Sequence, residues 1–315
     1  MTEEAPSPRF RSTRAFAPGH LTAVFSPVLA PRDPRARGST GAGLTLELGA
    51  WAEARFSPGR RARVTVRGSE RGPLPISTEV ARRLLRGRKG TLEVDLRHEL
   101  PVGQGFGMSA AGSLATALAV AELLGIPRQR AVETAHLADL FGGGGLGGVS
   151  AILGGGLELR ERAGVPPWGR VRHARWPGRV YVSVLGPPIP SPPLLSDPGF
   201  LGRVRRAAGD ALRRLDGSFD APSVFAEAER FGTRLAFAPP PLAEALRRLR
   251  RTGTWAAQAM FGGALFAFAP DPSSEGRLKE ELEALGHSAL ALRSASRGAH
   301  TLTRPHGPVR GRQAF

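Results

Sequence analysis

Apolar and polar residues alternate in three short segments of the first hundred residues. These segments are 43–48 (GLTLEL), 63–66 (RVTV) and 91–96 (TLEVDL). Alternation with a period of two places successive side chains on opposite faces of a sheet, so each segment predicts a strand with one buried face. Residues 78–86, which separate the last two segments, have the spacing of a short helix.

A longer apolar stretch begins near Ser109 and predicts a buried helix. A second helix is predicted to begin at Pro127, because proline is favoured in the first turn of a helix. The side chains that this helix turns toward a core are those of Ala131, Ala135 and Leu140. Four consecutive glycines, 142–145, are expected to end it.

The rest of the chain mixes strands and helices. Strands are predicted at 155–160, 180–185, 263–269 and 288–293, and helices at 200–215, 222–236, 241–251 and 276–285. Residues 186–199, GPPIPSPPLLSDPG, are rich in proline and predict a semi-rigid connector. Because a single core stops growing at about 250 to 300 residues, the 315-residue chain is expected to be an α+β protein with two domains, 1–185 and 186–315.

The composition excludes several kinds of site and predicts a location. The sequence has no cysteine, which excludes disulfides, Cys-ligated zinc, iron–sulfur clusters and thiol catalysis. The first ten residues, MTEEAPSPRF, have no apolar core, and the longest apolar run, 110–126, is shorter than the roughly 18 to 20 residues that span a bilayer. We therefore expect a soluble, cytoplasmic protein with no membrane partner. The basic segment 304–315 is expected to be loosely held.

The formal net charge of +17 raises the question of nucleic-acid binding. Only Lys89 and Lys279 are lysines, so 44 minus 2 leaves 42 arginines. These arginines are scattered along predicted helices and are not interleaved with aromatic residues. A GC-rich genome or a hot habitat accounts for such usage, and the scattered arginines argue against a nucleic-acid partner.

The stretch PVGQGFGMSAAGSLATALA, residues 101–119, runs from a glycine-rich loop into the first predicted long helix. Glycines that lead into a helix N-terminus let backbone N–H groups approach an anion closely. A Walker A loop needs Gly-Lys-Ser/Thr, which is absent, and a dinucleotide fingerprint would need glycine where Met108 stands. A nucleophile elbow, G-x-S-x-G, is nearly met by residues 107–111, and it would require an Asp and a His elsewhere. A hydrolase therefore remains an alternative.

The loop resembles the P-x-x-x-G-x-G-S-S-A pattern of the GHMP kinases, the superfamily named for galactokinase, homoserine kinase, mevalonate kinase and phosphomevalonate kinase. The residues in register are Pro101, Gly105, Gly107, Ser109, Ala110 and Ala111. Within that superfamily, several stretches are similar to the archaeal pantoate kinase family, and the resemblance extends from about residue 14 to 269. They are APGHLT at 17–22, GSTGAG at 38–43, QGFGMS at 104–109, AHLAD at 135–139, GLG at 145–147, GGLELR at 155–160, GVPPWG at 164–169 and, more weakly, QAMFG at 258–262.

The resemblance implies the two-domain GHMP kinase fold, with a ribosomal-protein-S5-like N-terminal domain and a ferredoxin-like α/β C-terminal domain. It implies ATP-dependent phosphorylation of (R)-pantoate to (R)-4-phosphopantoate, a step of coenzyme A biosynthesis, with ATP and Mg²⁺ as cofactors. A homodimer is a separate expectation. The nucleotide-binding residues that it implies are Pro101, Gly103, Gln104, Gly105, Phe106, Gly107, Met108, Ser109, Ala110 and Ala111. It also implies that Ser109 and Asp139 are catalytic and hold the metal. The residues implied to hold pantoate are His20, Ser39, His136 and Arg160.

The residues themselves leave simpler interpretations open. His136 precedes Asp139 by three positions, so both side chains are expected on one helix face and in one cleft. On its own, however, His136 could be a packing residue, Ser109 a helix N-cap, and Arg160 a solvated surface charge. Asp139 lies near the end of its predicted helix, where the helix dipole disfavours an acid, which suggests a functional role.

Three positions depart from the family pattern. Asp139 stands where the family has glutamate, Gly144 where it has threonine, and Gly148 where it has the aspartate taken as the base on the acceptor hydroxyl. Asp139 or water could serve as the base, positioning alone could suffice, or this copy could be catalytically poor. The alternative functions are a sister kinase acting on homoserine or mevalonate and a weak, Arg-rich binding protein on a kinase scaffold.

Overall fold

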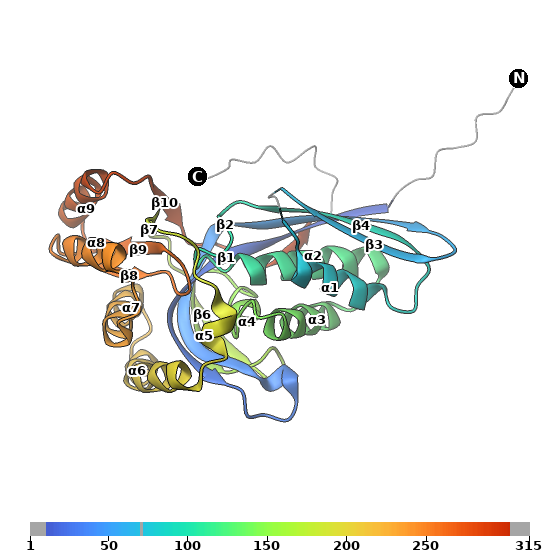
Figure 1. Ribbon diagram of the computed structural model, residues 1–315, viewed down its shortest axis with the longest axis horizontal. Coiled ribbons are helices and arrows are strands. Elements are labelled where there is room, and N and C mark those ends of the chain that lie inside the picture. Colours follow the sequence, from blue (N-terminus) through green and yellow to red (C-terminus); the bar gives the residue numbers. More distant parts are fainter. Residues whose placement is uncertain (1–10, 70–71, 303–315) are drawn as a thin grey trace, which may run out of the picture.

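The structure is a computed structural model that describes residues 11–69 and 72–302, and its strands form two sheets (Figure 1). The larger, seven-stranded sheet has the order β11-β1-β2-β4-β3, with β5 paired to β2 and β6 paired to β5. Its strands are β1 (Arg11–Val28), β2 (Gly38–Pro58), β3 (Ala62–Gly68), β4 (Gly90–His98), β5 (Leu157–Arg162), β6 (Arg170–Ala174) and β11 (His300–Leu302). The strands predicted at 43–48, 63–66 and 91–96 are confirmed as parts of β2, β3 and β4.

Helices cover one face of this sheet, with α2 packed directly against β1 and β2 (Figure 1). The elements on this side are η1 (Pro34–Ala36), α1 (Pro75–Leu85), α2 (Met108–Leu124), α3 (Arg128–Phe141) and α4 (Gly148–Ala151). Small alanine side chains let α2 approach the sheet closely, and Ser109 and Glu122 are its only residues that are not buried. In α3, Ala131 and Ala135 are fully buried as expected, whereas Leu140 is half-buried.

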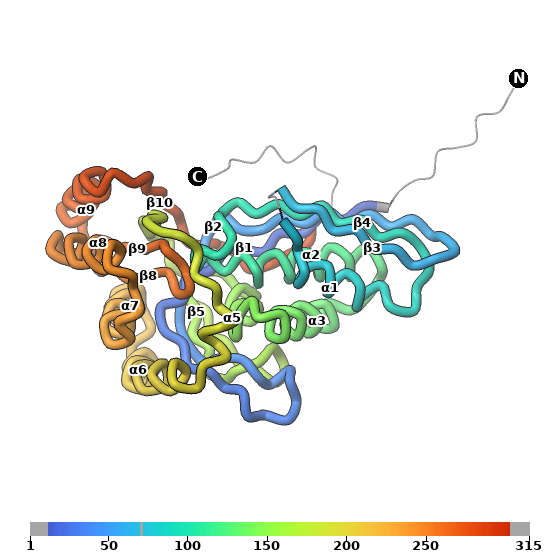
Figure 2. The backbone as a smooth tube through the Cα atoms, in the orientation of Figure 1, coloured from blue at the N-terminus to red at the C-terminus, as the bar shows by residue number. Residues whose placement is uncertain are grey.

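The second sheet has four strands in the order β10-β7-β9-β8. The strands are β7 (Arg179–Val184), β8 (Trp255–Gln258), β9 (Ala264–Phe268) and β10 (Ala289–Arg293), and the helices around them are α5 (Ser191–Leu195), α6 (Pro198–Gly217), α7 (Ala221–Leu235), α8 (Pro240–Arg250) and α9 (Pro272–Ala284). The tube in Figure 2 shows this part beside the larger sheet, with the 186–199 connector running between them.

The two sheets are not divided at residue 185 of the chain. β7 precedes that position and pairs with β9 and β10 of the second sheet, whereas β11 lies near the C-terminal end and pairs with β1 of the first. The division into 1–185 and 186–315 stays a prediction. The segment 304–315 that was expected to be loosely held lies outside the described residues.

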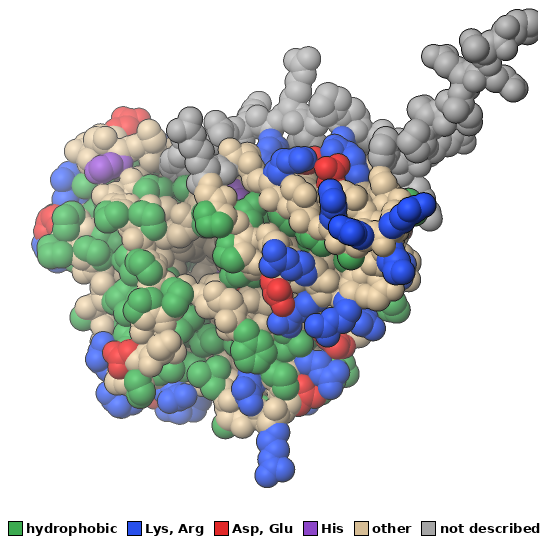
Figure 3. All heavy atoms as spheres, turned by 45° about the vertical axis from the view of Figure 1, so that its right-hand side comes forward, with side chains coloured by type: hydrophobic (Ala, Val, Ile, Leu, Met, Phe, Trp, Pro, Cys, Tyr) green, Lys and Arg blue, Asp and Glu red, His purple; other side chains and the backbone are tan. Residues whose placement is uncertain are grey.

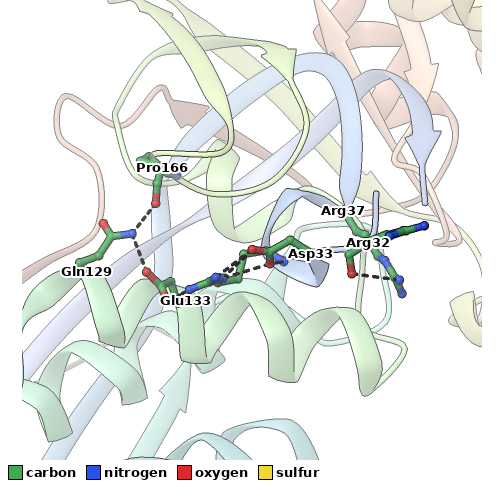
Figure 4. Close-up of polar contacts among 7 residues, drawn as sticks. Arg32, Asp33, Arg37, Gln129, Glu133 and Pro166 are labelled. Atoms are coloured by element: carbon green, nitrogen blue, oxygen red, sulfur yellow. Dashed lines mark hydrogen bonds and ion pairs between the residues drawn. The ribbon is translucent and has the colours of Figure 1, made fainter. Parts of the chain in front are cut away.

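The loop between β1 and β2 is fixed to α3 and to the loop that follows β5 (Figure 4). Arg35 pairs with Asp33 and Glu133, and its guanidinium lies 3.9 Å from the centre of the Trp168 ring. Gln129 donates from Nε2 to Glu133 Oε1 at 2.8 Å and also to the carbonyl oxygen of Pro166. These contacts hold the start of β2, and therefore Ser39, at a fixed place. Within the described part of the chain, none of the helices is both long enough and apolar enough to cross a membrane.

Candidate active site

A cavity of about 320 Å³ opens where the glycine-rich loop, the β1–β2 strands, the 144–148 glycines and the connector after β7 meet. Figure 3 shows a hollow near the middle of this face, bordered by apolar side chains, with Lys and Arg gathered on the right-hand part of the view. Of the described residues that line the cavity, Asp139 is the one acidic side chain and Arg160 the one arginine. The cavity therefore has a carboxyl group at one end and a guanidinium at the other.

The first turn of α2 lines this cavity. The N-cap is Gly107, which has a left-handed conformation (φ 68°) and gives no side-chain cap, so the expectation that Ser109 might be a plain N-cap is wrong. Gly103 and Gly105 also have positive φ, which lets the loop turn sharply. Backbone N–H groups at such a helix end favour an anion, including a phosphate.

The loop is tied to the second sheet by Gln104. Its Nε2 donates to the carbonyl oxygen of Gly186 at 3.0 Å, and its Oε1 accepts from the N–H of Gly263 at 2.8 Å. A Cβ at Gly105 would lie 2.6 Å from the Ala259 carbonyl oxygen, so only glycine allows this approach. Gln104 therefore fixes the loop and does not line the cavity, and neither do Pro101 and Ala111.

Ser109 and Asp139 form a hydrogen-bonded pair at the end of the cavity nearest to α2. Ser109 Oγ donates to Asp139 Oδ1 at 2.6 Å. Asp139 is 2% exposed, and burial raises the pKa of its carboxyl to about 6 although the Ser109 hydrogen bond lowers it. Because burial penalises a charge that lacks a cation, a cation placed here would be strongly favoured.

The three departures from the family pattern are neighbours in space. A Cβ at Gly144 would overlap both Asp139 Oδ1 and Ser109 Oγ. A Cβ at Gly148 would lie 2.6 Å from Ala110 Cβ and 4.0 Å from Asp139 Oδ2. Threonine at 144 would therefore displace Asp139 and Ser109, whereas aspartate at 148 would require Ala110 to move and would bring a second carboxylate close to Asp139. The three departures thus surround one carboxylate.

The opposite end of the cavity rests on a buried charge cluster made by His20, Glu158 and Arg160. His20 Nε2 donates to Glu158 Oε1 at 2.9 Å, and Arg160 Nη1 is paired with the same oxygen. The three side chains are no more than 3% exposed. A Cβ at Gly43 would lie 2.5 Å from His20 Nε2 and 2.9 Å from Glu158 Oε1, so this glycine of β2 makes the space for the cluster.

The pKa values of the cluster describe a neutral histidine beside an ion pair. Burial alone would raise the pKa of Glu158, but Arg160 and the His20 hydrogen bond outweigh it and hold that pKa below its ordinary value. Burial lowers the pKa of His20, against the opposing effect of Glu158. Glu158 is the residue whose role the sequence analysis missed. The available signal was the glycine pair Gly41 and Gly43, because glycines on the inner face of a strand mark the close approach of another group.

Arg160 has donors left over for a ligand. Nη1 donates to Glu158, while the N–H of Nε is buried and donates to no acceptor among residues 11–69 and 72–302. A Cβ at Gly147 would overlap Ser39 Oγ and lie 2.9 Å from Arg160 Nε, so the hydroxyl and this edge of the guanidinium face the same spot. An Nε–Nη2 edge matches a carboxylate in a two-point contact.

His136 lies apart from the cavity lining. Its ring is 2% exposed, and burial lowers its pKa although the backbone of Arg37 and Pro34 nearby acts in the opposite direction. Although Asp139 is one turn further along α3 and reaches the cavity, His136 faces the loop between β1 and β2. Its contact with a substrate stays a prediction.

The residues at the α2 end are suited to a magnesium nucleotide. Mg²⁺ is usually held by one or two protein oxygens together with substrate phosphates. Ser109 Oγ and Asp139 supply such oxygens beside a helix N-terminus. The space around these oxygens is open because residue 144 is a glycine. The residues present therefore fit this cofactor. For a hydrolase, by contrast, Ser109 would need a histidine partner, whereas its hydroxyl donates to the Asp139 carboxylate.

Two family profiles match the chain. The one described as GHMP kinases N terminal domain matches residues 76–156, and the one described as GHMP kinases C terminal matches residues 210–288. The first covers α1 to α4 together with the glycine-rich loop, and the second covers β8 and β9 of the second sheet with helices α7, α8 and α9 and the end of α6.

The chain is similar in sequence to proteins named as pantoate kinases and in structure to a phosphotransferase. The chain is 39% identical over 159 residues to the pantoate kinase of Thermococcus kodakarensis, which is 49% of this chain and 53% of that relative, so the match spans about half of its length. It is 30% identical over 221 residues to the pantoate kinase of Methanospirillum hungatei, covering 68% and 74% of the two chains. A solved structure described as a phosphotransferase related to the CoA biosynthesis pathway aligns with a TM-score of 0.83 at 29% identity, covering 94% of this chain and 100% of that one.

Proposed function

Since the chain belongs to the GHMP kinase family, we propose that it transfers the γ-phosphoryl group of ATP to the primary hydroxyl of (R)-pantoate, giving (R)-4-phosphopantoate. The observation that supports this proposal is one cavity that is lined on one side by the N-terminal turn of α2 and on the other by Arg160, whose Nε has no partner among the described residues. Gly147 borders Arg160, and the adjacent Gly148 borders Asp139. Consecutive Cα atoms are 3.8 Å apart, so the two ends suit a short hydroxy acid.

At the α2 end, the proposed task is to hold the phosphates and stabilise the charge that develops during transfer. The first-turn N–H groups of α2 and the glycine-rich loop would surround the phosphate oxygens without a cationic side chain. Ser109 and Asp139 would hold Mg²⁺, which when bound neutralises phosphate charge. Because Gln104 fixes the loop to the second sheet, little reorganisation of the loop would be required during the reaction.

At the other end, Arg160 and Ser39 would bind the carboxylate of the acceptor. Glu158 holds Nη1 of Arg160, which directs the remaining edge toward the cavity. Homoserine carries an ammonium group, and the only described acidic side chain lining the cavity is Asp139, at the phosphate end. A hydroxy acid without an ammonium group therefore fits better than an amino acid.

The acceptor hydroxyl must lose a proton as its oxygen bonds to phosphorus and the bond to ADP breaks. Gly148 offers no carboxylate, and Asp139 Oδ2 is the carboxylate oxygen that faces its position. General-base help is worth about 10²- to 10⁴-fold, and phosphoryl transfer depends mainly on positioning and electrostatics. We propose a working kinase in which proton removal is handled differently from the family pattern.

The test is an acceptor panel. Purified protein with MgATP is expected to release ADP with (R)-pantoate and to do so much more slowly with homoserine or mevalonate; ³¹P spectroscopy would place the phosphate on the primary hydroxyl. If pantoate does not accelerate ADP release, the proposal is wrong; faster ADP release with another acceptor would favour a sister kinase.

The Arg-rich binding protein is the other alternative. Binding to duplex nucleic acid with steep salt dependence, together with no ATP binding, would favour it. We also propose a cytoplasmic location and a possible homodimer.

A further inference from the structure

Phe261 has an uncommon backbone conformation at the edge of the cavity. It lies in the turn between β8 and β9, where the N–H of Gly262 donates to the Ala259 carbonyl oxygen at 3.1 Å, and its φ is 62°. A bulky side chain is rarely found at positive φ, and glycine would adopt this conformation without strain. Strained residues gather at functional sites, so the phenyl ring here requires an explanation.

The ring of Phe261 reaches from the second sheet to the first. Its centre lies 5.6 Å from that of Phe25 in an edge-to-face contact and 6.2 Å from that of Phe200. Phe25 is a residue of β1, and both Phe25 and Phe261 line the cavity. The two rings form one apolar surface, which we name the phenyl wall, at the junction of the two sheets.

The phenyl wall adjoins the arginine that faces the cavity. Phe25 pairs with Gly41 across β1 and β2, and Gly41 pairs with Arg160 across β2 and β5. A Cβ at Gly41 would overlap Arg160 Nη2 and lie 3.1 Å from the Phe25 Cα. The guanidinium therefore crosses over Gly41 toward Phe25, and a carboxylate held by Arg160 has the phenyl wall beside it.

We propose that the phenyl wall, Phe25 and Phe261, contacts the quaternary carbon of the acceptor and selects a branched hydroxy acid over an unbranched one. This inference rests on the proposed function. In pantoate, a carbon with two methyl groups lies between the carboxylate-bearing carbon C2 and the primary hydroxyl at C4. The wall lines the same cavity and lies beside the arginine proposed to hold the carboxylate, which only C2 separates from the methyl-bearing carbon. An unbranched acid would offer no methyl groups to the surface of the wall that faces the cavity.

The test compares (R)-pantoate with (R)-2,4-dihydroxybutanoate, which has the same carboxylate and hydroxyls and lacks both methyl groups. Their dissociation constants are measured by calorimetric titration, which does not require turnover. Wild-type protein is expected to bind pantoate at least about tenfold more tightly, the scale on which apolar pockets discriminate single carbon groups. Phe261→Ala and Phe261→Gly are expected to reduce this ratio to below about threefold. The Gly variant removes the ring and accommodates φ 62°, so it separates lost contact from backbone strain.

Phe219→Ala is the matched control. Phe219 is a half-buried phenylalanine of the same part of the chain, does not line the cavity, and should keep the wild-type ratio. An unchanged ratio in folded Phe261→Gly overturns the inference, as does wild-type protein that binds both acids equally; neither result touches the proposed phosphorylation. If the wild-type protein binds neither acid, the proposed function fails and this inference fails with it.

Discussion

Two buried carboxylates lie near opposite ends of the cavity, Asp139 in its lining and Glu158 behind Arg160, and they differ in their partners. Glu158 is fully buried and shares one oxygen between Arg160 and His20, which keeps its pKa below the ordinary value. Asp139 is almost as buried, forms no ion pair within the described residues, and has a pKa raised by burial to about 6. Equal burial thus gives opposite shifts.

The difference indicates what each acid does. Glu158 is neutralised inside the protein, so it acts on Arg160 and stays in one state. Asp139 has no cationic side chain as a partner among the described residues, so its ionised form is disfavoured by burial and would be favoured by a bound cation. A buried acid with a shifted pKa beside a helix N-terminus is a feature of functional sites. Replacing Glu158 and replacing Asp139 should therefore have different consequences.

The largest effect is expected for Glu158→Gln. The glutamine cannot balance Arg160, which is 2% exposed, and an uncompensated buried charge costs about 3 to 5 kcal/mol of unfolding free energy. Urea unfolding at neutral pH measures it. The control is Glu161→Gln on the same strand, whose partners Arg170 and Arg172 are exposed, with an expected loss below about 1 kcal/mol. Equal losses in the two variants would contradict a special role for Glu158.

Asp139→Asn is expected to lower kcat by about 10²- to 10³-fold, the scale of losing one charge-stabilising group at a transition state. Its fold should persist, because asparagine retains the size of the side chain and can still accept from Ser109. Steady-state ADP release with saturating pantoate measures the effect. Asp95→Asn, at an exposed ion pair on the outer face of the sheet, should leave kcat unchanged. A kcat near wild type in the Asp139 variant would rule out its role in transfer.

The next largest effect is expected in how the stability of Asp139→Asn depends on pH. A carboxyl whose folded pKa is raised stabilises the fold below its unfolded pKa and loses that contribution as pH rises through the folded value. For Asp139, the rise from 3.8 to about 6 corresponds to about 3 kcal/mol. Asp139→Asn should therefore be more stable than wild type by up to about 3 kcal/mol above pH 6 and no more stable below about pH 4. A difference that is constant from pH 4 to 8 would contradict the raised pKa.

The smallest effect is expected for Gly148→Asp, which restores the carboxylate of the family pattern. Its Cβ would lie 2.6 Å from Ala110 Cβ, and a second carboxylate would stand close to Asp139, so a loss of a few fold in kcat is expected. Ala110→Gly in the same chain should recover that loss by removing the clash. A gain of about 10²-fold in Gly148→Asp would mean that a missing base limits the wild-type enzyme.

The α2 end of the site could be predicted from the sequence because its parts are contiguous. A strand, glycines and a helix start follow one another in residues 91–109, and this order alone predicts an anion site. The two-domain α+β fold expected of a GHMP kinase is confirmed. Gly144 and Gly148 were recognised as departures, but only their distances to Asp139 show that the three changes belong together.

The Arg160 end could not be predicted in the same way. Alternation in residues 155–160 predicts a strand and says nothing about which strand lies beside it. The contact of Glu158 with His20 depends on the register that brings β1, β2 and β5 together. β1 itself, 18 residues long, was not predicted, because proline and glycine interrupt its alternation in the APGH stretch. The position of Phe261 depends on a turn between strands of the other sheet.

The most direct measurement compares Asp139→Asn with Arg160→Lys for both pantoate affinity and turnover. Lysine keeps the positive charge beside Glu158 and loses the two-point edge of the guanidinium. Asp139→Asn is predicted to bind pantoate with a dissociation constant within about twofold of wild type while kcat falls by about 10²-fold or more. Arg160→Lys is predicted to bind pantoate about tenfold or more weakly while kcat at saturation changes little. If both variants lose affinity equally, or both lose turnover equally, the division of the cavity into a transfer end and a carboxylate end is wrong.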